Sequence, residues 1–222
     1  MSDESKTPTP APATETTTGP HLSERGFTTR RMMLDVIVGL APVAAAAIWY
    51  FREWAVAQLA VSVAAALLTE ALFNWARRKP ISLTDGSAAV TGIILAFSLP
   101  PTLPLGMTAM GAAVAVALGK MVFGGLGHNI FNPAMVGRAF LMVCFALPMT
   151  QWANPAGVDA ATAATPLATG GSELLNLCRG DVSGSLGDTS AARVILGGLW
   201  LIFRGSADWR LALGMLAGAA VL

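Results

Sequence analysis

The fold class of this chain is most evident between Thr91 and Thr150, TGIILAFSLPPTLPLGMTAMGAAVAVALGKMVFGGLGHNIFNPAMVGRAFLMVCFALPMT. It contains only two charged residues, Lys120 and Arg138. A charged side chain at the centre of a bilayer costs about 3 kcal/mol or more. An uncharged run of this length, interrupted by Pro and Gly, therefore indicates several membrane-spanning helices.

The composition of the whole chain supports this interpretation. Of the 222 residues, 54% are hydrophobic and 12% are charged, and the mean hydropathy is +0.60. A soluble domain is about 25% charged. A water-soluble globule, a disordered chain and a nucleic-acid-binding protein are therefore poor fits. The net charge of +1 points to no acidic partner.

The apolar runs predict an all-α, polytopic transmembrane bundle of about seven spans. Two segments that precede apolar runs, Asp85–Gly92 and Gly184–Ala191, resemble each other loosely and suggest an internal repeat, inverted or tandem. The predicted spans are 33–50, 54–74, 87–99, 105–122, 133–149, 191–203 and 211–222.

Residues 1–26 are expected to form a disordered cytoplasmic tail, because they are rich in Thr and Pro and poor in apolar residues. Residues 27–222 then form the transmembrane domain. The positive-inside rule places the N-terminus in the cytoplasm, since most of the 14 basic residues then lie inside. The same orientation turns the loop at 151–190 outward.

A glycine- and asparagine-rich segment, Gly124–Gly137, lies between two predicted spans. Asn132-Pro133 has the form of a helix start, with Asn as N-cap and Pro in the first turn. Irregular backbone at membrane depth is tolerated where protein or a cavity satisfies its polar groups. The segment is either a re-entrant turn that serves packing or a place where amides face a ligand.

Four ionisable residues lie within or near the spans, and such residues are candidates for function. Asp35 and Arg193 lie near span ends, where they can simply reach the interface. The same applies to Glu70, about one turn from the end of its span. Arg138 lies inside a span, where a guanidinium can bind phosphate, carboxylate or carbonyl oxygens. The two cysteines and two histidines form no ligand cluster, so no metal site is expected.

Polar residues in the outward loop offer further candidates. Asp188, Thr189 and Ser190 precede a predicted helix; they can cap it, and the helix N-terminus also suits a phosphate. Thr162 and Thr165 lie among alanines, where a hydroxyl is accessible for modification, although most such stretches are only loops.

Six segments, in this order along the chain, resemble the RnfD/NqrB family of integral membrane flavoprotein subunits. The similarity covers roughly residues 20–222, and the short tail and Met-Leu-Asp-Val start are more similar to RnfD than to NqrB. The matching segments are Thr29–Val36, Asp85–Gly92, Ser98–Pro101, Gly124–Arg138, Ala164–Leu167 and Gly184–Ser190.

The resemblance implies FMN attached through its phosphate to Thr165, in a stretch that retains Ala-Thr-Pro-Leu. This chain departs from the family pattern at three positions: Ala160 and Ala163 replace Gly, and Thr162 replaces Ser. Thr162 is therefore an alternative acceptor of the FMN phosphate. The family implies attachment outside the cytoplasm by a flavin transferase of the ApbE type. It also implies a second, non-covalent flavin, riboflavin, whose residues we do not assign. Arg138, Asp188, Thr189 and Ser190 are candidates for holding the FMN.

The function implied by the resemblance is that of a subunit in the bacterial inner membrane. It would relay electrons within an Rnf-type complex that couples ferredoxin–NAD exchange to Na⁺ or H⁺ transport, with the other Rnf subunits as partners and Glu70 on the ion path. An NqrB-type subunit of a Na⁺-pumping NADH–quinone reductase is the alternative. The residues alone also allow two other functions: a solute channel or transporter without flavin, and an inactive scaffold. Since the chain ends inside an apolar run, we expect it to be incomplete at its C-terminus, as a fragment, a truncated product or part of a split gene.

Overall fold

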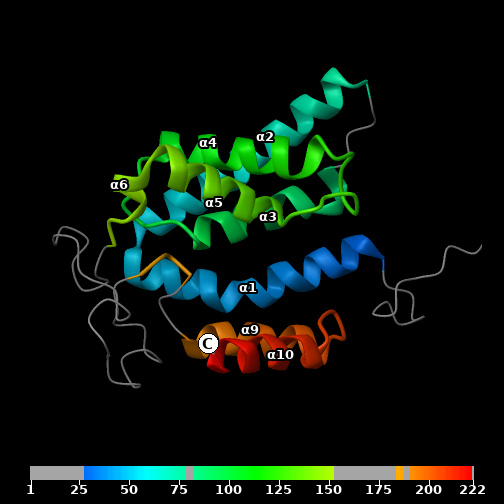
Figure 1. Ribbon diagram of the computed structural model, residues 1–222, viewed down its shortest axis with the longest axis vertical. Helices are drawn as coiled ribbons and strands as arrows, with labels where there is room; N and C mark the ends of the chain where they lie inside the picture. The colour runs from blue at the N-terminus through cyan, green and yellow to red at the C-terminus, as the bar shows by residue number, and fades with distance from the viewer. Residues whose placement is uncertain (1–27, 79–82, 153–183, 188–190, 222) are drawn as a thin grey trace, which may run out of the picture.

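The computed structural model describes residues 28–78, 83–152, 184–187 and 191–221, and every regular element within them is helical (Figure 1). This confirms the predicted all-α bundle. A short 3₁₀ helix, η1 (Leu83–Asp85), and a π-helical segment, η2 (Ala117–Met121), accompany the α-helices. The α-helices are α1 (Thr29–Phe51), α2 (Glu53–Ala76), α3 (Ser87–Phe97), α4 (Leu105–Val116), α5 (Pro133–Cys144), α6 (Ala146–Met149), α9 (Ala191–Phe203) and α10 (Trp209–Val221).

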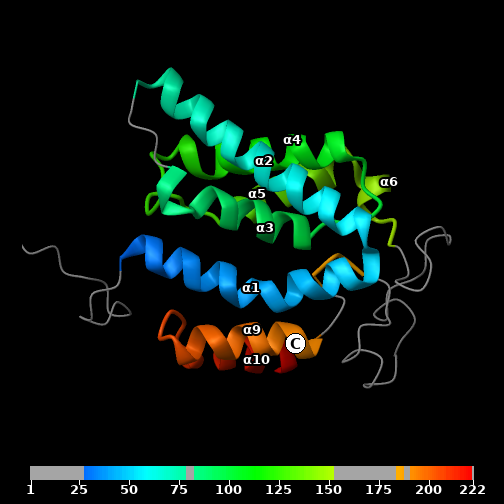
Figure 2. The same cartoon turned by 180° about the vertical axis from the view of Figure 1, so that it is seen from behind.

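The helices lie side by side and alternate in direction (Figures 1 and 2). α2 packs against α3 and α4, α4 packs against α5, and α1 packs against α9. Arg77, Arg78 and Arg204 follow the ends of α2 and α9 at one end of the bundle, which we call the basic end. We call the opposite end of the bundle the far end. α3 and α9 run in opposite directions, as an inverted repeat requires, and the repeat itself stays a prediction.

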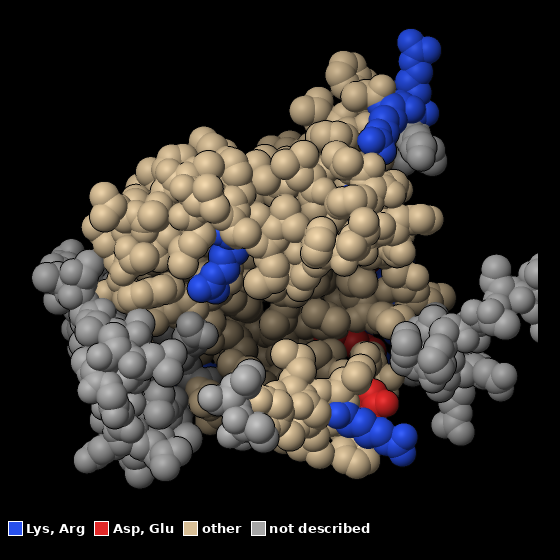
Figure 3. All heavy atoms as spheres, viewed as in Figure 1, with Lys and Arg blue, Asp and Glu red and all other residues tan. Residues whose placement is uncertain are grey.

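The outer surface of the bundle is that of a membrane protein. α1 and α2 are long and apolar enough to cross a bilayer, and only 28% and 22% of the residues in their most apolar windows are buried. Large apolar side chains such as those of Leu68, Val143 and Phe203 are exposed. Figure 3 shows one face that is almost free of charged groups, with most of its charges gathered at the basic end. A lipid environment explains this surface, which water would disfavour.

Glycines let the helices approach closely. A Cβ on Gly92 would lie 2.8 Å from the Cα of Val63, and the Ser62 hydroxyl donates to the Gly92 carbonyl at 2.7 Å. A Cβ on Gly137 would lie 2.6 Å from the carbonyl oxygen of Gly111. Small residues at helix contacts are typical of membrane bundles, because van der Waals packing replaces the hydrophobic effect there.

Two predicted spans differ from the structure. The predicted span 133–149 breaks at Phe145 into α5 and α6. The physical reason is Pro148, which lacks the N–H that would continue the α-helical ladder and restricts the residue before it. The predicted span 105–122 ends in the π-helical segment η2, where the backbone N–H of Val122 bonds to the carbonyl of Ala117 at 3.0 Å.

The short segment 184–187 is fixed at the far end. The N–H of Leu186 donates to the Leu99 carbonyl at 3.1 Å, and that of Gly187 donates to the Phe97 carbonyl at 2.8 Å. Leu186 is fully buried. The described part of the motif that begins at Gly184 therefore meets the motif Ser98–Pro101 at the C-terminal end of α3.

Candidate functional site

The described part of the chain contains a cavity of about 280 Å³ near the basic end, where several motifs of the sequence converge. The start of α3, the segment η2, the glycine- and asparagine-rich segment and the start of α1 all contribute to its wall. Hydroxyl, amide and ammonium groups alternate there with apolar side chains. The lining residues are Met33, Ser87, Val90, Thr91, Ile94, Lys120, Leu126, Asn129, Asn132 and Pro133.

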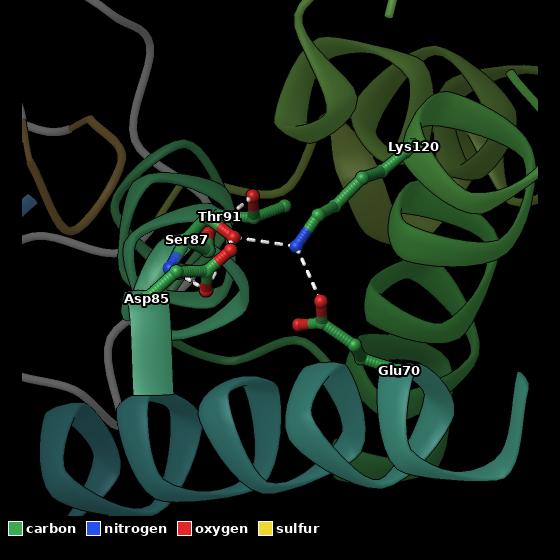
Figure 4. Close-up of polar contacts among 5 residues, drawn as sticks. All are labelled: Glu70, Asp85, Ser87, Thr91 and Lys120. Atoms are coloured by element: carbon green, nitrogen blue, oxygen red, sulfur yellow. Dashed lines mark hydrogen bonds and ion pairs between the residues drawn. The ribbon is translucent and has the colours of Figure 1, made fainter. Parts of the chain in front are cut away.

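Lys120, one of the lining residues, forms a buried ion pair with Glu70 (Figure 4). The Nζ of Lys120 lies 2.7 Å from Oε1 of Glu70, and the two side chains are only 3% and 1% exposed. The same ammonium donates to the Ser87 hydroxyl oxygen at 2.5 Å. Because both charges are removed from water, each depends on the other for its stability.

Asp85 extends this polar chain towards the basic end. Its Oδ1 accepts hydrogen bonds from the backbone N–H of Ser87 at 3.0 Å and from the Ser87 hydroxyl at 2.9 Å. Between them, Gly86 has φ +76°, a conformation that favours glycine. The Asp-Gly-Ser sequence thus starts α3 and fixes the hydroxyl that receives Lys120. Thr91, one turn later, donates to the Ser87 carbonyl at 2.9 Å.

Lys120 lies in the π-helical segment η2. A π-turn adds one residue to the α-helical register and is frequent at functional sites. Gly119 makes room for this segment, because a Cβ there would lie 2.7 Å from the Cα of Pro133. On the other side, Nη1 of Arg77 donates to the Met121 carbonyl at 2.8 Å. The backbone around Lys120 is therefore held by Arg77, which follows α2, and by the start of α5.

The glycine- and asparagine-rich segment forms the open side of the cavity. Gly124, Gly125 and Gly127 all have positive φ, so the chain can turn where side chains would be strained. The predicted helix start is confirmed: Oδ1 of Asn132 accepts from the N–H of Ala134 at 3.0 Å. Asn132 itself lines the cavity, and this bond leaves its Nδ2 without a role in the cap. The Nδ2 of Asn129, another lining residue, donates to the Phe131 carbonyl at 3.2 Å. Its Oδ1 takes no part in this bond.

The predicted site residues do not all converge here. Glu70 belongs to the site, and the alternative that it reaches the interface is wrong, because Lys120 holds it inside the bundle. Arg138 is half-buried on α5 and does not line the cavity. Its role in holding a cofactor stays a prediction. Thr162, Thr165, Asp188, Thr189 and Ser190 lie outside the described residues.

Asp35 is also buried rather than at the interface. Its Oδ1 accepts from Nε of Arg204 at 3.0 Å, and its Oδ2 accepts from the Ser206 hydroxyl at 3.1 Å. The pair ties the start of α1 to the end of α9. At the far end, Arg193 lies over the ring of Tyr50, 5.5 Å from its centroid.

Two site residues, Lys120 and Ser87, were not assigned a role from the sequence. Lys120 is one of two charges in a long uncharged run, and this position is itself a signal for function. Ser87 carries no such signal, since a serine before an apolar run is usually a helix cap.

Comparison with known proteins places these features in a family context. A family profile described as the NQR2, RnfD, RnfE family matches residues 15–222. The RnfD protein of a proton-translocating ferredoxin:NAD(+) oxidoreductase complex from Clostridium ljungdahlii is 38% identical over 209 residues, covering 86% of this chain and 63% of that protein. The RnfD protein of the Na(+)-translocating complex from Acetobacterium woodii is 39% identical over 201 residues, with the same coverage.

A further relative, the RnfD protein of an ion-translocating oxidoreductase complex from Halorhodospira halophila, is 34% identical over 248 residues, covering 94% of this chain and 69% of that protein. The chain thus spans about 63% of the length of the first two relatives.

Proposed function

Because the chain belongs to the NQR2, RnfD, RnfE family, we propose that it acts as the RnfD component of an ion-translocating ferredoxin:NAD⁺ oxidoreductase complex in a bacterial inner membrane. The other subunits of that complex are its proposed partners. The observation that carries this proposal is the polar cavity with its buried ion pair, inside a bundle whose surface is apolar. An inert scaffold would gain stability by filling this space with apolar side chains.

We propose that FMN is attached through its phosphate to Thr165 by an ApbE-type flavin transferase. The retained Ala-Thr-Pro-Leu sequence supports this assignment, and Thr162 is the alternative acceptor. The described residues that flank the loop also support it. Trp152 follows α6, and Gly184 begins the segment 184–187 that is bound to the end of α3; both lie at the far end of the bundle, away from the basic end.

Intact mass of the full chain, co-expressed with the transferase, tests the attachment. A mass increase equal to FMN, with in-gel flavin fluorescence, is expected for the wild type and for Thr162→Ala. Thr165→Ala should abolish both signals. Loss in Thr162→Ala alone would move the attachment site. No flavin in the wild type would contradict the electron-carrier function and favour a solute channel or transporter.

We further propose that the cavity at the basic end holds the second flavin, riboflavin. A flavin ring presents carbonyl and ring-nitrogen acceptors, one N–H donor and two apolar faces. Nδ2 of Asn132, Oδ1 of Asn129 and the Thr91 hydroxyl can serve the polar edge. Val90, Ile94 and other apolar residues can cover the faces. The residues present therefore fit this group.

A bound flavin would supply the capacity to accept and release electrons, and the chain would supply binding and charge. The asparagines would orient the ligand by hydrogen bonds, Asn132 being held by its cap on α5 and Asn129 by the Phe131 carbonyl. Val90 and Ile94 would shield the ring faces from water, which strengthens electrostatic contacts at the cavity wall. Lys120 places a positive charge at its wall. Binding of riboflavin, followed by fluorescence quenching, should weaken in Asn129→Ala and remain unchanged in Gly198→Ala, a position with no neighbour within 4 Å of an added Cβ.

The proposed orientation puts the basic end in the cytoplasm and the far end outside. Reporter fusions test it: a fluorescent protein fused after Arg78 should be active in the cytoplasm, and alkaline phosphatase fused after Trp152 should be active outside. The reverse pattern would contradict the proposed side of FMN attachment.

An NqrB-type subunit is the alternative within the family. Its electrons would pass to a quinone rather than to NAD⁺. Assays of the complex with ferredoxin and NAD⁺, and separately with NADH and a quinone, distinguish the two.

A further inference from the structure

Helix α5 carries a charge for which the described part of the chain supplies no partner. Arg138 forms no hydrogen bond, ion pair or ring contact with any residue that the structure describes. The carboxylates among the described residues either have partners of their own or lie at helix starts. They are Asp35, which binds Arg204; Glu70, which binds Lys120; Asp85, which binds Ser87; and Glu53 and Asp208, which lie at the starts of α2 and α10.

Arg138 lies in the middle of α5, at the border between its packed face and its exposed face. It is the sixth of the 12 residues of this helix. Residues three and four positions away share its side of the helix. Among them, Ala134 and Leu141 are fully buried, whereas Met135 and Met142 are 43% and 41% exposed. The charge is therefore carried within an apolar band, with exposed methionines one turn before it and one turn after it.

An arginine in such a place requires a counter-charge. Charged side chains within membrane segments are rare, and they pair with one another or with backbone carbonyls, because an unpaired charge in an apolar medium is unfavourable. The guanidinium presents its donors in a planar fork that matches the two oxygens of a carboxylate. The partner of Arg138 therefore comes from outside the described residues, and a carboxylate fits it best.

The side chains around Arg138 suit the approach of another helix. We call Met135, Arg138, Ala139, Met142 and Val143 the outer α5 face; α5 lies on the side of the bundle seen in Figure 1, opposite α2, which is in front in Figure 2. Ala139 is exposed and small, which lets a second backbone come close. Methionine side chains adapt their shape to a partner. Val143, at 85% exposure, extends the same apolar face towards the far end.

We propose that the outer α5 face is the docking surface for a membrane-spanning helix of a neighbouring subunit, and that a carboxylate of this helix binds Arg138. The inference rests on the proposed function, since it requires that the chain belongs to a multisubunit complex. The phosphate of a lipid lies at the bilayer surface, whereas apolar side chains flank Arg138 on both sides along α5. Lipid phosphate and the FMN phosphate are the competing ligands in the experiments below.

The first experiment separates folding from assembly. In the chain purified alone, Arg138→Leu should leave the melting temperature within about 2 °C of the wild type, because no described contact is lost. In cells that co-express the other subunits of the complex, the same variant should recover them at least about tenfold less well than the wild type. Arg138→Lys, which keeps the charge but not the planar fork, should lose less. Equal recovery by the wild type and Arg138→Leu, or a large fall in the melting temperature of the isolated variant, would overturn the docking surface.

The second experiment identifies the partner by cross-linking. p-Benzoylphenylalanine placed at Ala139 is activated by light in membranes that hold the complete complex, and mass spectrometry locates the adduct. We expect an adduct with an apolar segment of another subunit, in which an Asp or Glu lies within one turn of the modified residue. Changing that carboxylate to Arg should restore the recovery of the complex that Arg138→Glu loses. Adducts with lipid alone, or with residues 151–190 of the same chain, would contradict a partner helix and favour a lipid phosphate or the FMN phosphate.

The two possible failures are distinguishable. Recovery of the other subunits with the wild type, without an adduct between subunits at Ala139, would refute this docking surface and leave the proposed function standing. Absence of every other subunit from the wild-type preparation would contradict the proposed function, and this partner with it.

Discussion

Removing one member of the Glu70–Lys120 pair should destabilise the bundle far more than removing both. At an effective dielectric constant of about 20, two unit charges separated by 2.7 Å attract each other by ~6 kcal/mol. The loss of hydration offsets part of this gain, and loss of one partner from a buried pair costs about 3–5 kcal/mol. We therefore expect Lys120→Met and Glu70→Leu each to lower the free energy of unfolding by about that amount.

The double variant Glu70→Leu/Lys120→Met replaces the pair by two apolar side chains. Its loss should be smaller than the sum of the single losses by about 2 kcal/mol or more, because no unpaired charge is left in the interior. Unfolding by titration with SDS, followed by circular dichroism, measures all four proteins. Thr69→Val should stay close to the wild type, since its hydroxyl contacts only its own helix.

The cycle would refute the reasoning if the two single losses simply added, within about 0.5 kcal/mol. The charges would then contribute independently, and the short contact in the structure would carry no mutual stabilisation. Small single losses, below about 1 kcal/mol, would show that the site is hydrated rather than buried.

Three further predictions concern the packing that builds the site. Asn132→Ala should cost about 1 kcal/mol because the N–H of Ala134 loses its acceptor, whereas Asn132→Ser should retain most of the stability; the melting temperatures of the two variants decide this. Gly137→Ala should cost about 1–3 kcal/mol, since its Cβ would lie 2.6 Å from the Gly111 carbonyl, while Gly198→Ala should be neutral; equal melting temperatures would contradict the close contact. Asp35→Ala should weaken the contact between α1 and α9 by about 1 kcal/mol, because Arg204 is partly exposed and solvent screens the pair; faster proteolysis in the turn between α9 and α10 is the expected result, and unchanged proteolysis would count against it.

The helices of the bundle could be predicted closely because their limits are chemical features of the chain itself. Arg77 and Arg78 mark the end of α2, and Asn132-Pro133 marks the start of α5. A charged or helix-breaking residue acts locally, whatever the rest of the chain does. The break at Phe145 and the π-turn at η2 were missed, since a continuous apolar run shows neither.

The candidate site, too, could be predicted only in part. That Lys120 and Glu70 matter could be inferred from their positions in apolar runs. Their mutual contact could not, because they are separated by 50 positions along the chain. It depends on the rotation and register of α2 and η2 against each other.

The membrane class, most helix limits, the capped start of α5 and the family resemblance could thus be read from the sequence, because each follows from local composition or from a contiguous motif. The packing of the helices brought residues of Asp85–Gly92 and Gly124–Gly137 together around one cavity, paired its Lys120 with Glu70, and buried Asp35 against Arg204. The physical reason is that the register between packed helices is set by close contacts such as Gly119 against Pro133 and Gly92 against Val63. Such contacts depend on the shapes of both partners at once, which a single stretch of sequence does not contain.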